Sequence, residues 1–124
     1  MIQYTKANIR TWSIMGSSGT VGFVMLDIAE KNDKIFVMTA DQSINSGLAR
    51  FKETFPTRYI NAGIAEQNMV TIAAGLAKEG FNPYITAQAP FITMRCTDQV
   101  RVNLGYMQLP VKLIGIASGY AQGE

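Results

Sequence analysis

Hydrophobic residues in this chain fall into short apolar runs that alternate with segments of helical periodicity. The runs lie at residues 34–40, 58–61, 82–87 and 111–117. Each is nearly continuous in apolar residues, which is typical of buried strands in a parallel sheet. Helical periodicity dominates at residues 46–54, 66–78 and 90–107. This alternation predicts one α/β domain, a doubly wound and mostly parallel sheet flanked by helices.

Residues 10–31 are also predicted to be helical, but the glycines between Gly16 and Gly22 weaken that prediction. Each interior glycine costs a helix about 1 kcal/mol. Two interpretations stay open: one long helix, or a loop with the helix beginning near Thr20. The small residues there would also let another backbone approach closely. Core positions predicted on these helices are Ile14, Val21, Val24, Met25, Ile28, Ala29, Met69, Ile72, Ala73, Leu76, Met94, Val100 and Leu104.

Composition excludes several classes of function. The 124 residues carry a net charge of only +2, and their Lys and Arg are spread along the chain, unlike a nucleic-acid-binding face. No apolar run approaches the roughly 20 residues of a membrane span, and the polar start does not resemble a secretory leader. A single cysteine, Cys96, excludes an internal disulfide, fits a cytoplasmic location and is expected to be a small core residue. The absence of histidine excludes histidine-ligated zinc and Ser-His-Asp or Cys-His catalysis within the chain.

Candidate polar groups follow each predicted strand, at Asp41, residues 63–66, residues 88–91 and residues 118–124. Ligands of parallel sheets bind beyond the carboxyl ends of the strands, so these groups should share one edge. The glycines at 16–22 are not a phosphate-binding loop, because no preceding strand and no Gly-Lys-Ser/Thr ending is present.

Glu66 is a lone carboxylate in the first turn of a very apolar helix, directly after a glycine turn. One interpretation is a carboxylate that interacts favourably with the helix dipole. The other is contact with a ligand, since burying an unpaired carboxylate is costly. Arg95 and Arg101 are expected to form solvated or interface ion pairs, with contact to a phosphosugar as the alternative for Arg95.

Several segments together resemble the transketolase family, specifically the pyrimidine-binding domain of thiamine-diphosphate enzymes. Similarity extends from about residue 28 to the end and is most specific in the sequence GIAEQNM. The resembling segments are VMTAD at 37–41, FPTRYINAGIAEQNM at 55–69, Phe91 to Arg95, DQVR at 98–101 and LPV at 109–111. Among such proteins the chain most resembles the C-terminal subunit of a transketolase split into two polypeptides.

The resemblance implies that Glu66 is catalytic and hydrogen-bonds N1′ of the aminopyrimidine of thiamine diphosphate. That contact favours the imino tautomer, which removes the proton from the thiazolium C2, so that the carbanion chemistry belongs to the cofactor. Phe91 is expected to stack on the aminopyrimidine, with Ile92 as the alternative, and Ile64 and Asp41 complete the expected cofactor contacts. Desolvation in the closed site should favour a neutral Glu66, whereas in the isolated chain we expect an ordinary carboxylate.

The resemblance also implies partners that this chain does not contain. No Gly-Asp-Gly followed by a spaced Asn is visible, so diphosphate and magnesium are expected on an N-terminal partner subunit. Two such pairs would form a heterotetramer that transfers a two-carbon ketol unit between phosphosugars. We expect residues 1–124 to be a single pyrimidine-binding domain, truncated at its C-terminal end and inactive alone.

Three alternatives remain for the function. Two are enzymes: a subunit similar to deoxyxylulose-phosphate synthase, or a β-type subunit of a 2-oxoacid dehydrogenase. The third is a non-catalytic assembly module with the same fold. The residues QNM at 67–69 favour the transketolase interpretation.

Overall fold

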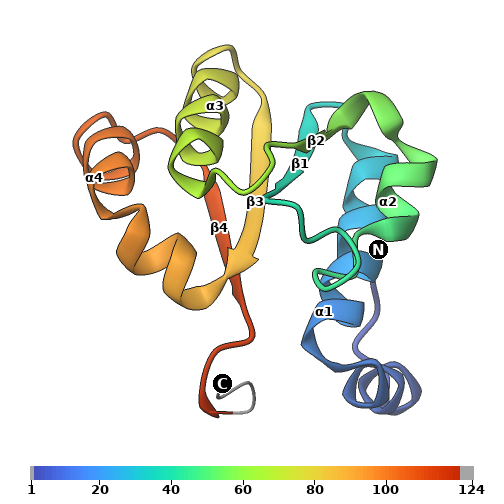
Figure 1. The fold of residues 1–124 in the computed structure, drawn as a ribbon. Coiled ribbons are helices and arrows are strands. Elements are labelled where there is room, and N and C mark those ends of the chain that lie inside the picture. The colour runs from blue at the N-terminus through green and yellow to red at the C-terminus, as the bar shows by residue number, and fades with distance from the viewer. Residues whose placement is uncertain (1, 121–124) are drawn as a thin grey trace.

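A four-stranded parallel sheet forms the centre of the molecule, whose computed structural model describes residues 2–120. The strands are β1 (Ile35–Thr39), β2 (Tyr59–Asn61), β3 (Asn82–Gln88) and β4 (Lys112–Ile116), arranged in the order β2-β1-β3-β4. The chain crosses over between β1, β2 and β3 and places helices on both faces of the sheet (Figure 1). The predicted α/β architecture is therefore confirmed, with strand ends that differ from the predicted ones by no more than one residue.

Each face of the sheet has its own hydrophobic core. Helices α1 (Lys6–Lys31) and α2 (Ala49–Thr54) cover one face, and α3 (Glu66–Lys78) covers the other together with the segment after β3 (Figure 1). Successive side chains of β1 enter opposite cores. Val37 packs in the core beneath α1 and α2, whereas Met38 packs in the core beneath α3. No helix among residues 2–120 has the length and apolar character needed to cross a membrane.

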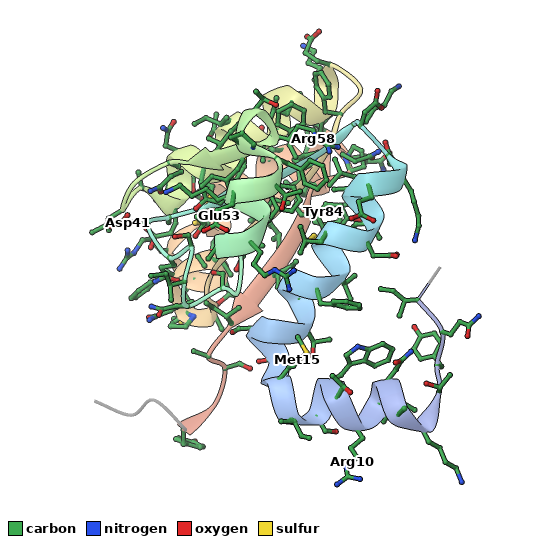
Figure 2. The ribbon with its side chains drawn as sticks, turned by 90° about the vertical axis from the view of Figure 1, so that its right-hand side faces the viewer. Arg10, Met15, Asp41, Glu53, Arg58 and Tyr84 are labelled. Atoms are coloured by element: carbon green, nitrogen blue, oxygen red, sulfur yellow. The ribbon has the colours of Figure 1, made fainter. Side chains whose placement is uncertain are left out.

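Helix α1 is continuous in sequence but sharply bent at Gly16, which has φ 71° and ψ −178°. Figure 2 shows the first part of the helix, which carries Arg10, turning away from the remainder near Met15. The chain is thus helical on both sides of Gly16, so neither sequence-based interpretation was complete. The predicted core position Ile14 was wrong: its side chain is 78% exposed, because the bend carries it away from the sheet.

The predicted close backbone approach at the small residues of α1 is confirmed. A Cβ atom built on Gly22 would lie 2.0 Å from the carbonyl oxygen of Gly47, and one built on Gly47 would lie 2.1 Å from that of Ser18. Residues 42–48 therefore form a turn against α1, and α2 begins at Ala49, later than the predicted position 46. The buried hydroxyl of Ser46 accepts a hydrogen bond from Thr86 on β3 and fixes this turn to the sheet.

The predicted helix at 90–107 is irregular. It consists of two π-helical segments, η2 (Phe91–Arg95) and η3 (Val100–Tyr106), joined by the short helix α4 (Thr97–Gln99). A π-helical turn contains more residues than an α-helical one and so rotates the side chains that follow. The inward prediction for Met94 was therefore wrong, since 79% of it is exposed, whereas Val100 and Leu104 pack against the core as predicted.

Arg58 joins α1 to β2 at the amino end of the sheet. It ends the 3-10 turn η1 (Pro56–Arg58), and its Nη1 donates to the carbonyl oxygens of Ala29 and Asn32, both at 3.0 Å. Its guanidinium also lies over the ring of Phe55, 4.1 Å from the centroid. The side chain thus satisfies carbonyl groups at the C-terminus of α1 that have no partner within the helix.

Candidate functional site

The polar groups predicted after each strand do share the carboxyl edge of the sheet. Parallel pairing places Thr39 of β1 opposite Asn61 of β2 and Thr86 of β3, so the segments that follow these strands leave the sheet on the same side. Asp41, Gly63 to Glu66 and Gln88 to Phe91 all lie there. Of the predicted loop at 118–124, residues 121–124 lie outside the described part of the chain.

Glu66 is the first residue of α3 and is only 3% exposed. Its carboxylate is paired, because Nη1 of Arg95 lies 3.0 Å from its Oε2. The structure thus adds two facts about Glu66 that the sequence did not give, its burial in the isolated chain and its partner there. Arg95 does form an ion pair, but its partner is a buried carboxylate of the same chain and not the solvated or interface partner that was predicted. The sequence indicated only that a buried carboxylate needs a partner, because Glu66 follows β2 and Arg95 follows β3, and β1 lies between these strands in the sheet.

Arg95 also contacts the aromatic candidate of the site. Its guanidinium carbon lies 4.1 Å from the centroid of the half-buried Phe91 ring, in a cation–π arrangement. Its backbone oxygen accepts a hydrogen bond of 3.0 Å from Nε2 of Gln67. Ile92 is 1% exposed and packs in the core, so it turns away from the edge. Of the two stacking candidates, Phe91 is the one with accessible surface.

Asp41 and Asn61 connect the ends of β1 and β2. Asp41 is exposed and takes the left-handed conformation, with φ 57°. The side-chain oxygen of Asn61 accepts from the backbone N–H of Asp41 at 2.9 Å and of Gly63 at 3.0 Å, and its amide donates to Asp41 Oδ1 at 3.2 Å. Sequence reasoning missed Asn61, although asparagine before a glycine turn commonly organises the backbone in this way.

Large apolar side chains are exposed after three of the strands. They are Ile44 after β1 (81% exposed), Ile64 after β2 (79%) and Met94 after β3 (79%). Exposed apolar side chains gathered on one side of a protein often mark a contact with another molecule. Ile64, which was predicted to contact the cofactor, is among these exposed side chains and lies two residues before the start of α3.

Cys96 is buried directly beside the ion pair. Its thiol donates to the backbone oxygen of Phe91 at 3.2 Å. Burial raises the pKa of the Cys96 thiol, the negative charge of Glu66 raises it further, and the positive charge of Arg95 opposes both. The thiol is therefore neutral at physiological pH and contributes to packing, as predicted. Among residues 2–120, no three His, Cys, Asp or Glu side chains come together as a metal site would require.

Curated proteins similar to this chain are enzymes and enzyme subunits. The chain is 41% identical to the 1-deoxy-D-xylulose-5-phosphate synthase of Clostridium perfringens, over 77% of this chain and 15% of that protein. It is 38% identical to a 6-deoxy-6-sulfo-D-fructose transketolase subunit of a Clostridium species, over 77% of the chain and 30% of the relative. It is 35% identical to an apulose-4-phosphate transketolase subunit of Phocaeicola vulgatus, over 80% of this chain and 32% of that subunit. The chain thus spans a third or less of the length of each relative.

A solved structure and a family model agree with these relatives. The solved structure, described as a split gene transketolase in an inactive beta4 tetramer, matches 77% of this chain with a TM-score of 0.70 and 35% identity, and the chain covers 32% of it. The family model for the transketolase pyrimidine binding domain matches residues 17–124, which leaves out the part of α1 that precedes the bend. Together with the fold and the edge described above, this match shows that the chain belongs to the transketolase family, as its pyrimidine-binding domain.

Proposed function

We propose that this domain supplies the pyrimidine-binding half of a thiamine-diphosphate site in a transketolase assembled from two kinds of polypeptide. The observation that carries the proposal is the buried Glu66 carboxylate at the start of α3, next to the accessible ring of Phe91. A carboxyl group and an aromatic face are the two contacts that a planar, nitrogen-containing ring needs. The residues present therefore fit the cofactor that the family implies.

Each residue has a distinct task in this proposal. Glu66 would hydrogen-bond N1′ of the bound aminopyrimidine, and its burial would keep competing water away from that contact. Phe91 would stack on the ring, and Ile64 would pack beside it. Asp41, held by hydrogen bonds with Asn61, would bound the site on the side of β1. The bound cofactor itself supplies the carbanion chemistry of two-carbon transfer.

A diphosphate-binding partner subunit would complete the site and hold magnesium with the diphosphate. The exposed Ile44, Ile64 and Met94 support an interface at this edge, since a partner would bury them. The names of the transketolase subunits and of the tetrameric structure support an assembly of several chains. The proposed active form is a heterotetramer that acts on sugar phosphates in the cytoplasm.

The test combines this chain with a diphosphate-binding transketolase subunit, adds thiamine diphosphate and Mg²⁺, and measures two-carbon transfer between sugar phosphates. The change Glu66→Gln should lower kcat by about 100-fold or more, since general acid–base catalysis contributes about 10²–10⁴-fold. The matched control is Glu79→Gln, which alters an exposed glutamate that follows the same helix. It should leave turnover unchanged. Equal turnover of wild type and Glu66→Gln would remove the proposed role of Glu66.

A second candidate activity is formation of 1-deoxy-D-xylulose 5-phosphate. The 41% identity to the synthase of Clostridium perfringens favours it. The same mixture, supplied with substrates of that synthase, distinguishes the two activities by the product formed. Release of the deoxy sugar phosphate without ketol transfer would select the synthase.

A further inference from the structure

We propose that the guanidinium of Arg95 occupies the place of the cofactor's aminopyrimidine in the cofactor-free chain and leaves when the cofactor binds. This inference rests on the function proposed above. It adds a state of the site in which a side chain of this chain contacts both Glu66 and Phe91, the two residues assigned to the cofactor.

The geometry of Arg95 reproduces the two contacts expected of the ring. Its Nη1 donates to Glu66 Oε2 at 3.0 Å, which is the carboxylate assigned to N1′. Its guanidinium carbon lies 4.1 Å from the centroid of Phe91, the ring assigned to stacking. A guanidinium is planar, carries N–H donors and stacks on aromatic rings, so it resembles an aminopyrimidine in shape and in hydrogen bonding.

The two occupants exclude each other for steric reasons. The Arg95 guanidinium already lies over the Phe91 ring and against the carboxylate of Glu66, which is only 3% exposed, so a second planar group cannot make the same two contacts at the same time. The side chain of Arg95 is 46% exposed, so it has a path to solvent. Its backbone meanwhile stays fixed by the hydrogen bond from Gln67. Departure of the guanidinium therefore requires side-chain rotation alone.

The paired state explains how a buried carboxylate is tolerated before the cofactor arrives. An unpaired charge in this position would be strongly unfavourable, and Arg95 removes that penalty. The same contact lowers the affinity for the cofactor, because the binding-competent fraction of molecules is only the fraction with Arg95 displaced. If that fraction is about one tenth, the apparent Kd is about tenfold higher than the intrinsic Kd.

The decisive variant is Arg95→Met, which keeps an unbranched apolar stem and removes the charged plane. We would titrate the cofactor-free complex of this chain and its diphosphate-binding partner with thiamine diphosphate at fixed Mg²⁺, by isothermal titration calorimetry. The expected result is an apparent Kd about tenfold lower than that of wild type. A lower Tm of the cofactor-free variant complex should accompany it, because the ion pair is lost. The matched control is Arg101→Met, at an exposed arginine of η3, which should change neither quantity.

The outcomes separate this inference from the proposed function. Wild-type complex that binds the cofactor, with Arg95→Met binding equally or more weakly, overturns the inference and leaves the function standing. Wild-type complex that binds no thiamine diphosphate overturns the function and the inference with it. If Arg95→Met does not fold, Arg95→Lys decides by the same titration. It keeps a cation for Glu66 without the planar group, so its Kd should fall by about threefold, and an unchanged or higher Kd would overturn the inference.

Discussion

Replacement of Gly22 by alanine should destabilise the domain, although alanine is the better helix former. An ideal Cβ at position 22 lies 2.0 Å from the carbonyl oxygen of Gly47, about 1.4 Å short of the 3.4 Å of ordinary contact. Both sides of this contact are backbone, so neither can yield by rotating a side chain. Overpacking of this kind costs about 3 kcal/mol at the upper end of its usual range. The gain in helix propensity returns about 1 kcal/mol, which leaves a loss of about 2 kcal/mol.

Urea denaturation followed by circular dichroism measures this loss as a change in the free energy of unfolding. For a domain of this size the expected fall in Tm is about 8 °C. The control is Gly75→Ala on α3, where an added Cβ meets no atom within 4 Å and the residue is exposed. That variant should gain about 0.5–1 kcal/mol. If Gly22→Ala were as stable as wild type, the proposed contact between α1 and the turn at 42–48 would be refuted.

Two further changes test the frame around the site. The change Arg58→Met removes both hydrogen bonds to the C-terminus of α1 and should lower the free energy of unfolding by about 2 kcal/mol. Amide hydrogen exchange at the end of α1 should become faster. Unchanged exchange there would contradict the capping role of Arg58. The raised pKa of Cys96 makes stability depend on pH, because only the unfolded chain releases the thiol proton as the pH rises above its ordinary value of about 8.5. Stability should therefore be fully present below that pH and fall above it, toward the raised folded pKa. In denaturation curves recorded from pH 7.5 to 10, Cys96→Ala should reduce the fall of the free energy of unfolding with pH. An equally steep fall in the variant would count against a raised pKa of Cys96.

The alternation of apolar runs and helical segments was sufficient to predict the fold, because the central strands β1 and β3 are mostly buried and helices cover them on both faces. Helix α3 was predicted with its observed ends, since glycine turns bound it at Gly63 and Gly80, both at positive φ. No local sequence pattern predicted the strand order β2-β1-β3-β4. The order depends on which strands pair, and pairing is decided by contacts between residues far apart in the sequence.

The failures at Ile14 and Met94 share one cause. Both predictions assumed a regular α-helix where the helix is irregular. Its direction changes at Gly16, and the number of residues per turn changes in the π-helical segment η2. Periodicity assumes a fixed number of residues per turn, so it cannot place side chains beyond such a change. Tertiary packing decides where these irregularities occur.

For the site, the sequence by itself determined that a lone carboxylate begins an apolar helix at the carboxyl edge of a parallel sheet. It also placed an aromatic residue and an arginine after the third strand. Only the tertiary structure decided that Glu66, Phe91 and Arg95 meet, with Ile92 turned into the core. The physical reason is that charge pairing and ring stacking act over a few ångströms, and residues 66 and 95 come that close only after β3 has entered the sheet.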